Sequence, residues 1–317
     1  MNIKEYFGDS KILITGASGF VGRNLFNHLK KQGCNVVGTR FKRNVEGLVQ
    51  CDLTKFDEVM ELMKDVKYIF LNAARTYGAE VLKNNPSAMV VDTVSMNGNV
   101  LEAAYRTGIV EKILYVSSST VYQDAYRTLN EDELDWNKNP FKAYMGVAWV
   151  KRYIEKLCEF YSQLGMEIVI VRPTNIYGPY DKYEEGKSHF IPAIIKRALE
   201  KQKPFVVWGT GKSVKNVIYI EDFIRDILKV FLQHSSIDAI NVCGDGEYSI
   251  TDIVNVILKE TNHITIPIYD PSKPDSIPYR GISRKKLDCL YGKETYTSLD
   301  KGIKNTVNWL EKELDEK

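Results

Sequence analysis

Residues 11–31 read KILITGASGFVGRNLFNHLKK, and this stretch decides the fold. An apolar run at 11–15 is typical of a buried strand, and apolar residues at helical spacing continue to Lys31. Between them stand Gly16, Gly19 and Gly22. Glycines in this place let the backbone approach a pyrophosphate, whose charge then faces the helix N-terminus. The stretch therefore predicts a dinucleotide-binding unit, and a plain strand-to-helix turn is the alternative.

The same alternation continues through the first half of the chain. It predicts strands at 35–38, 68–71, 113–116 and 168–171, and helices over 55–64, 86–106 and 141–164. Strands that alternate with helices indicate an α/β fold with a Rossmann-type, doubly wound parallel sheet.

The texture of the sequence changes after Pro173, where proline, glycine and aromatic residues interrupt the alternation. This change predicts a smaller mixed α/β substrate domain in the C-terminal half, and a helix over 222–233 is expected to return to the sheet. We therefore expect a dinucleotide-binding domain and a substrate domain. Their predicted bounds are 1–173 plus about 217–243 for the first, and 174–216 plus 244–317 for the second.

Composition narrows the class of protein. The 317 residues include 43 Lys+Arg and 41 Asp+Glu, so the net charge is +2, which argues against a nucleic-acid partner. There is no run of about 18 apolar residues to cross a membrane, and the first ten residues do not resemble a signal peptide. The five cysteines form no CxxC pair and the four histidines do not cluster, so no metal site is expected. These features predict a cytoplasmic protein.

The residues after the second expected strand bear on the choice of cofactor. An acidic residue there would bind the ribose diol of NAD. This chain instead has Arg40, Lys42 and Arg43, which suit a 2′-phosphate. NADP is therefore favoured within NAD(P), NAD is the alternative, and a solvated basic loop is the other interpretation.

Further motifs follow the glycine turn in a fixed order. They are Gly16–Gly22 with the spacing G-x-x-G-x-x-G, Asp52-Leu53, Asn72-Ala73-Ala74 and the segment 117–122. This order resembles the extended short-chain dehydrogenases/reductases. The resemblance implies that the following residues bind the cofactor: Gly16, Ser18, Gly19, Phe20, Gly22, Arg40, Asp52, Leu53, Asn72, Ala73, Ala74, Lys151 and Pro173.

Motifs of the second half resemble one branch of that superfamily, GDP-L-fucose synthase and related GDP-sugar oxidoreductases. They are the segments 172–179, 188–192, 207–211, 219–222 and 273–275. In this branch the histidine at the position of His189 donates a proton near the sugar. The resemblance also implies substrate contacts at Arg75, Asn175, Lys187, His189, Trp208, Lys215 and Arg280. Lys215 stands where the family has arginine, so a bidentate grip on phosphate becomes a point charge; for the cations, exposed solvated charge is the alternative.

The catalytic helix departs from the family pattern. Relatives place a tyrosine four residues before a lysine, and a serine or threonine polarises the reacting oxygen. Ser118 matches that hydroxyl, and Lys151 matches the lysine because Glu155 follows it four residues later. This alignment leaves Val147 at the position of the tyrosine.

Another group must then handle the proton. Tyr144 lies seven residues before Lys151, and a packing aromatic is the alternative interpretation of that residue. We predict that the proton is handled by Tyr144, by His189, or by a water held by Ser118 and Thr120.

These motifs together predict an NAD(P)-dependent oxidoreductase that acts at C4 of a nucleotide-linked sugar. The expected substrate is a GDP-hexose or GDP-heptose used for surface polysaccharides, and the enzyme would be a 4-dehydrogenase or a 4-keto reductase. The alternatives are a nucleotide-sugar epimerase that retains NAD, and a non-catalytic protein that binds cofactor and sugar nucleotide. Because many relatives pair through two helices of the first domain, a homo-oligomer is expected.

Overall fold

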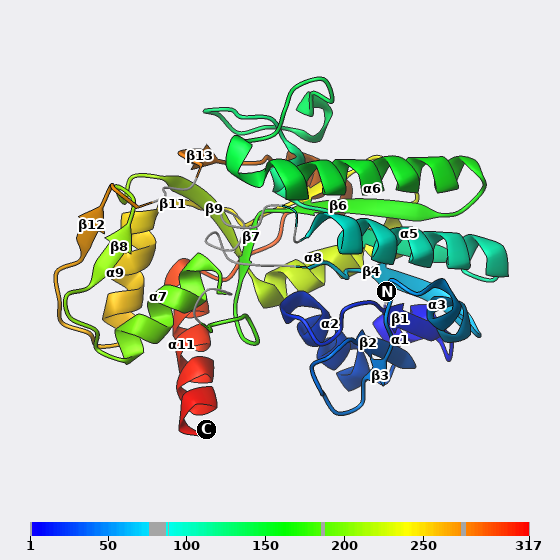
Figure 1. The fold of residues 1–317 in the computed structure, drawn as a ribbon, viewed down its shortest axis with the longest axis horizontal. Coiled ribbons are helices and arrows are strands. Elements are labelled where there is room, and N and C mark those ends of the chain that lie inside the picture. Colours follow the sequence, from blue (N-terminus) through cyan, green and yellow to red (C-terminus); the bar gives the residue numbers. More distant parts are fainter. Residues whose placement is uncertain (1, 76–86, 88, 185–187, 274–276, 317) are drawn as a thin grey trace.

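The computed structural model describes residues 2–75, 87, 89–184, 188–273 and 277–316. Within them, a parallel sheet has the strand order β10-β6-β5-β4-β1-β2-β3. Figure 1 labels β6, β4, β1, β2 and β3 of this sheet. The chain runs outward from β1 to one edge and then from β4 to the other edge, which is the doubly wound order. This topology confirms the predicted fold class. The strands of this sheet are β1 (Lys11–Ile14), β2 (Val36–Arg40), β3 (Val49–Gln50), β4 (Val66–Leu71), β5 (Lys112–Val116), β6 (Ile168–Pro173) and β10 (Ile240–Val242).

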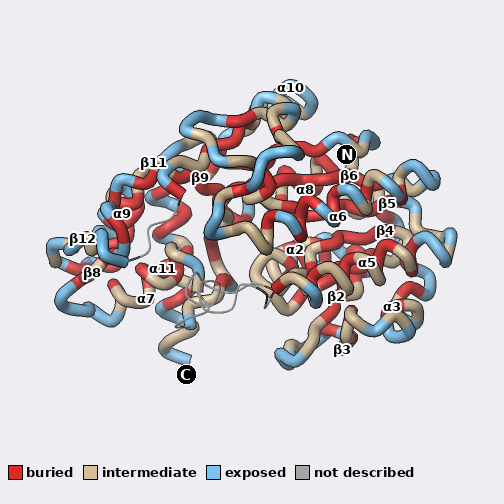
Figure 2. Tube along the Cα trace, turned by 45° about the horizontal axis from the view of Figure 1, so that its top comes forward, coloured by how far each residue is buried: buried red, intermediate tan, exposed pale blue. Residues whose placement is uncertain are grey.

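Helices cover both faces of this sheet because successive strand residues point to opposite sides. Ile12 and Ile14 of β1 belong to the core shared with α2 and α8, and Leu13 belongs to the core shared with α3, α5 and α6. Figure 2 shows the buried positions along the strands and on the inner faces of these helices. The helices are α2 (Phe20–Lys31), α3 (Phe56–Leu62), α5 (Val90–Thr107), α6 (Met145–Gln163) and α8 (Ile220–Gln233), and a short α1 (Ile3–Phe7) precedes β1.

The helix predicted over 141–164 begins later than expected, at Met145. Phe141 is extended, and Lys142–Tyr144 form a 3-10 turn in which Lys142 and Ala143 are exposed. Burial of the helix begins at Ala148, so the residues before Met145 have no apolar face to pack and do not extend it. Tyr144 is therefore the residue that caps α6 rather than part of its first turn.

The C-terminal half contributes two small sheets. Strand β9 (Val214–Tyr219) pairs with β7 (Asn175–Tyr177), β11 (Glu247–Ser249) and β13 (Tyr279–Arg280), and β8 (Val206–Trp208) pairs with β12 (Ile268–Asp270). As expected, α8 returns the chain to the large sheet, where β10 pairs with β6. The remaining helices are α7 (Phe190–Leu199), α9 (Ile250–Glu260), α10 (Lys285–Tyr291) and α11 (Leu299–Asp315). None of the described helices has the length and apolar character needed to cross a bilayer.

Candidate active site

The turn between β1 and α2 forms a narrow cradle. Gly16 has φ +68°, a conformation that residues with a Cβ rarely adopt. A Cβ on Gly22 would lie 2.4 Å from the carbonyl oxygen of Gly16. The backbone of this turn and the first helical turn therefore approach each other as only glycine allows. Such an approach leaves the α2 N-terminus open to a diphosphate, so this cradle fits the pyrophosphate of a dinucleotide. Ser18, Gly19 and Phe20 line the same turn.

Two buried threonines join the strand ends around this cradle. Thr39 of β2 accepts a hydrogen bond from the Gly16 amide at 2.9 Å. Thr15 accepts from the amides of Asn72 and Ala73, each at 3.0 Å. The predicted cofactor residues Asn72, Ala73 and Ala74 are thereby held against the glycine turn, at the carboxyl edge of the sheet where dinucleotides bind in this fold.

The ribose side of the predicted cofactor site is cationic. Arg40 ends β2, and its Nε is buried without a hydrogen-bond partner among the described residues. Asp52 follows β3 and accepts from the Thr54 amide and hydroxyl, which lowers the pKa of its carboxyl. Leu53 beside it is buried. Arg75, predicted to bind substrate, instead pairs with Asp92 at 3.0 Å and stacks on Phe41, the residue that follows Arg40.

The segment after β5 carries the predicted hydroxyl groups. Ser118 Oγ accepts a hydrogen bond from the Thr120 amide at 3.2 Å. Thr120 Oγ1 is buried, and no described residue hydrogen-bonds it. Lys151 Nζ donates to the carbonyl oxygen of Val116 at 2.7 Å, and burial lowers the pKa of this ammonium to about 8. The structure thus brings Ser118, Thr120 and Lys151 together at the end of β5.

A buried ion pair lies beneath this segment. Glu155 accepts from Ser117 Oγ at 2.5 Å and from Arg172 at 2.8 Å. Arg172 also donates to the Tyr122 hydroxyl at 3.1 Å, and Tyr122 donates to Asn241 of β10. The residues on either side of Ser118 are therefore held by hydrogen bonds to Glu155 and Arg172, whose opposite charges pair with each other. From the sequence, Glu155 served only to identify Lys151. Its pairing with Arg172 was not predicted, although a glutamate and an arginine within otherwise apolar patterns indicate a buried ion pair.

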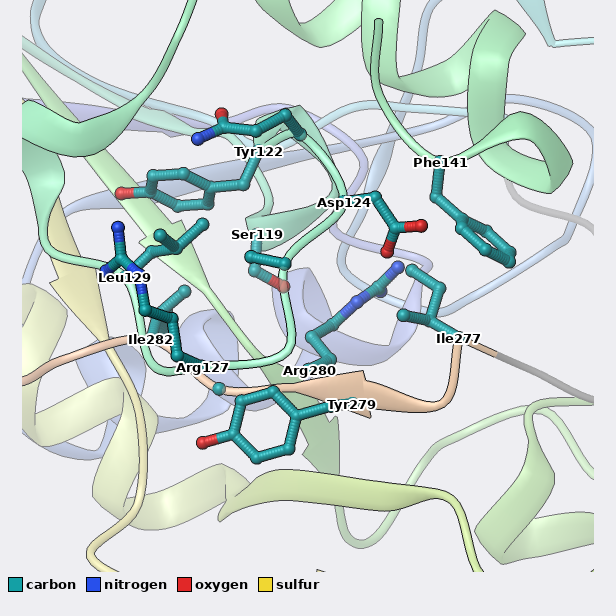
Figure 3. Close-up of a pocket in the computed structure, with 13 residues that line it drawn as sticks. Ser119, Tyr122, Asp124, Arg127, Leu129, Phe141, Ile277, Tyr279, Arg280 and Ile282 are labelled. Atoms are coloured by element: carbon teal, nitrogen blue, oxygen red, sulfur yellow. The ribbon is translucent and has the colours of Figure 1, made fainter. Parts of the chain in front are cut away.

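Tyr144 and Val147 precede Lys151 at the start of α6. Val147 is half-buried in the first turn of α6, one turn before Lys151, and provides no proton. Tyr144 stacks on Arg280, whose guanidinium carbon lies 4.7 Å from the centre of the ring. Arg280 is half-buried, and desolvation of its guanidinium lowers its pKa; its Nη2 has no hydrogen-bond partner among the described residues. In Figure 3, Arg280 and Asp124 extend toward each other in a small pocket of about 30 Å³ that opens to solvent.

His189 has a partner that sequence reasoning did not assign. Its Nδ1 lies 3.0 Å from a carboxylate oxygen of Asp181, whose side chain is 1% exposed. Burial alone would lower the pKa of His189, but the hydrogen bond and the charge of Asp181 raise it. Asp181 stands inside the motif that follows Pro179, and its position eight residues before His189 was the available signal.

Of the other predicted substrate residues, some lie on the sheet around β9 and others lie elsewhere. Arg280 of β13 and Lys215 of β9 are opposite each other in register, and Lys215 donates to the carbonyl of Ile277. Asn175 of β7 donates to the carbonyl of Asn216 at 3.3 Å. Trp208 lies on β8 of the separate two-stranded sheet and is 46% exposed. Lys187 lies outside the described residues.

Comparison with known proteins shows which family has this fold and these motifs. A family model described as "NAD dependent epimerase/dehydratase family" matches residues 12–243. GDP-L-fucose synthase of Sinorhizobium fredii is 30% identical over 310 residues, which cover 94% of this chain and 95% of that protein. GDP-L-colitose synthase of Yersinia pseudotuberculosis is 30% identical over 318 residues, with 94% and 97% covered. The solved structure of a GDP-L-fucose synthetase from Naegleria fowleri bound to NADP is 25% identical, with a TM-score of 0.84 and coverage of 97% and 95%.

These matches span nearly the whole chain and agree with the resemblance read from its motifs. They confirm NAD(P) as the class of cofactor expected for the glycine cradle and leave the choice between NAD and NADP open. The chain belongs to the NAD dependent epimerase/dehydratase family.

Proposed function

We propose that this protein is an NAD(P)-dependent oxidoreductase that acts at C4 of a GDP-linked hexose or heptose. One observation carries the proposal: Ser118, Thr120 and the buried Lys151 converge at the end of β5, on the same sheet edge as the glycine cradle. Two relatives that are 30% identical over almost their whole lengths are named for GDP-sugars, which supports this substrate class. The reaction would serve sugar biosynthesis for surface polysaccharides.

The cradle residues Gly16, Gly19 and Gly22 would hold the pyrophosphate, and Arg40 would bind the ribose end. When bound, the cofactor supplies or accepts hydride at the sugar carbon. The unpartnered Nε of Arg40 favours a 2′-phosphate and thus NADP. Titration with NADPH and NADH tests this choice: Arg40→Ala is expected to weaken NADPH binding about tenfold or more and NADH binding about twofold or less. Equal losses for both cofactors would contradict the assignment of Arg40.

Three groups of this chain are candidates for moving the sugar hydroxyl proton. The Thr120 hydroxyl is buried with no described partner, so it is available to the substrate oxygen or to a water shared with Ser118. His189 is held through Nδ1 by Asp181, which leaves Nε2 as its proton donor. Tyr144 supplies a phenol at the start of α6. Val147, at the position where relatives have the tyrosine, supplies none.

The nucleotide part of the substrate would lie against the second sheet. Lys215 and Arg280 are neighbours across the β9–β13 pairing, and together they provide two positive charges for a diphosphate. Asn175 on the adjacent β7 would contact the sugar.

The deciding experiment combines identification of bound nucleotide with turnover. The purified chain is analysed by ultraviolet spectrum and mass for any NAD(P) or GDP-sugar that co-purifies. It is then assayed with GDP-mannose plus NADP⁺ or NAD⁺, and with a GDP-4-keto-6-deoxy sugar plus NADPH or NADH. Oxidation or reduction at C4, identified by NMR of the product, would support the proposal; UDP-sugar turnover in preference to GDP-sugar turnover would contradict it.

Val147 favours one alternative, a non-catalytic protein that kept both binding sites. Such a protein binds NADPH and GDP-sugars but shows no transfer even in a single-turnover mixture with stoichiometric cofactor. An epimerase differs again, because it inverts a sugar carbon and returns its cofactor to the starting redox state. NMR of the product together with the absorbance of NADPH separates these outcomes: an inverted sugar carbon without net change in NADPH identifies an epimerase.

A homo-oligomer is also part of the proposal. Trp149, Tyr153, Phe160 and Leu164 follow one stripe of α6, and each is between 40% and 52% exposed. Tyr105 of the neighbouring α5 is 43% exposed and adjoins Tyr161 of α6. Aromatic residues grouped on the surface of two packed helices are typical of an interface between subunits. We therefore propose that two copies pair through α5 and α6.

A further inference from the structure

Two consecutive cations of α6, Lys151 and Arg152, both point into the protein. Neighbouring residues of an α-helix project roughly 100° apart, so one of the two would ordinarily face solvent. Here Lys151 is 7% exposed and Arg152 only 1% exposed. Lys151 is a catalytic residue in the proposed reaction, but the proposed reaction does not explain why the charge of Arg152 is buried.

Arg152 connects two parts of the backbone that are distant in sequence. Its Nε donates to the carbonyl oxygen of Val121 at 2.7 Å, and its Nη1 donates to the carbonyl oxygen of Lys138 at 2.6 Å. Between these residues the chain forms a loop that lies between β5 and α6, and an isolated bridge joins Gln123 to Pro140 near its two ends. Arg152 therefore closes the base of the excursion formed by residues 121–138.

Both ends of this excursion lead to groups that are candidates for proton transfer. Val121 directly follows Thr120, and the backbone beyond Lys138 enters the turn that ends in Tyr144. A guanidinium is rigid and planar and donates in two directions at once, whereas an ammonium on a flexible stem does not fix two acceptors relative to each other. The contacts of Arg152 thus set the spacing between the Ser118–Thr120 segment and Tyr144.

We propose that Arg152 is a positioning residue that holds the Ser118–Thr120 segment and the Tyr144 turn in one arrangement for proton transfer. The inference rests on the proposed function. Where relatives carry the phenol on the helix itself, this chain has Val147 and draws its candidate groups from two separate segments. Groups on separate segments need a common support to keep productive geometry, and Arg152 provides it through two backbone carbonyls.

The test compares Arg152→Met and Arg152→Lys with the wild-type full-length chain. Methionine keeps the apolar stem and removes both donors, while lysine keeps the charge and one donor. Arg106→Met is the control, because Arg106 is exposed on α5, where it pairs with Glu102 and stacks on Phe56, and it contacts neither segment held by Arg152. Hydrogen exchange, the NADPH dissociation constant, kcat and KM are measured for each variant.

Arg152→Met is expected to raise hydrogen exchange in the peptides spanning 118–125 and 138–145 and to leave β1 and β4 protected. Its kcat is expected to fall about tenfold or more while the NADPH dissociation constant changes less than about twofold. Arg152→Lys should fall between Arg152→Met and the wild type, and Arg106→Met should match the wild type. If Arg152→Met does not fold, Arg152→Lys carries the comparison, with the same two segments expected to loosen.

A double-mutant comparison separates positioning from simple support of the fold. Tyr144→Phe should reduce kcat less in the Arg152→Met background than in the wild type, because both changes act on one arrangement. Full additivity, an unchanged kcat, or an equal loss of NADPH affinity and kcat would overturn the proposal. Hydrogen exchange keeps the two hypotheses apart: absence of turnover in the wild type defeats the proposed function, whereas unchanged exchange in Arg152→Met defeats the role of Arg152.

Discussion

If His189 is the proton donor of the proposed reaction, its pairing with Asp181 should set how the rate responds to pH. Asp181 raises the pKa of His189 above its ordinary value of 6.5, so the ring remains protonated at a higher pH than a free histidine. A proton donor works below its pKa and fails above it. We expect the rate of 4-keto sugar reduction to fall as pH rises through a pKa higher than 6.5.

Asp181→Asn tests the cause of this shift. Asparagine keeps a hydrogen-bonding oxygen beside Nδ1 but removes the charge, so the pKa of His189 should fall and the inflection in the kcat profile should move to lower pH. His189→Ala should remove this inflection and leave the one expected from Lys151, whose pKa is about 8. An inflection that stays in place in Asp181→Asn would show that another group titrates.

Gly22 offers a second test at the scale of a single residue. A methyl group at this position would lie 2.4 Å from the Gly16 carbonyl oxygen and 2.8 Å from Ala17 Cα, both backbone atoms of the cradle. Gly22→Ala must displace the turn, and we expect NADPH binding to weaken by about two orders of magnitude or more. Gly98→Ala is the matched control on α5, where a Cβ meets nothing within 4 Å. That change should preserve binding and raise the melting temperature slightly, since alanine favours the helix.

At the scale of an element, α6 carries the departure from the family pattern. Tyr144→Phe removes the phenol at the N-cap of this helix and is expected to lower kcat by about a hundredfold. Val147→Tyr in that background restores the four-residue spacing to Lys151 and should recover part of the rate. Tyr153→Phe, on an exposed position of the same helix, is the control and should keep full activity. Full rates in both Tyr144→Phe and His189→Ala would remove these two residues from proton transfer.

The same helix shows what sequence can and cannot foretell. The strands were predictable because a buried parallel strand needs a continuous apolar run, as at 113–116 and 168–171. The glycine cradle was predictable because close backbone approach excludes a side chain. The start of α6 was not, because burial along this helix begins only at Ala148 and the residues before Met145 form a 3-10 turn instead. The eight-residue spacing of Asp181 and His189 was the only local signal of their pairing, and the inward turn of Arg152 arises from tertiary contacts that no local pattern records.

At the scale of the whole molecule, the aromatic stripe on α6 should control assembly. Tyr153 and Phe160 are 51% and 52% exposed, and carboxylates at these positions would be desolvated at an interface. The double variant Tyr153→Glu/Phe160→Glu is expected to convert a dimer to a monomer, measured by light scattering after gel filtration. Ile264→Glu is the control, because Ile264 is 93% exposed on the segment before β12. A monomeric wild type, or a double variant that still forms dimers, would contradict pairing through α6.

The position of β10 in the sheet has a consequence for biosynthesis. Strand β6 is buried along its whole length, yet its outer neighbour is β10, which the ribosome makes only after β7, α7, β8, β9 and α8. During translation β6 is therefore an apolar edge strand that is open to pairing with other chains. A fragment that stops before Ile240 retains this edge, so truncated forms of the protein should aggregate or require a chaperone. The exposed edge of β6 is covered only when residues 240–242 leave the ribosome and pair with it as β10.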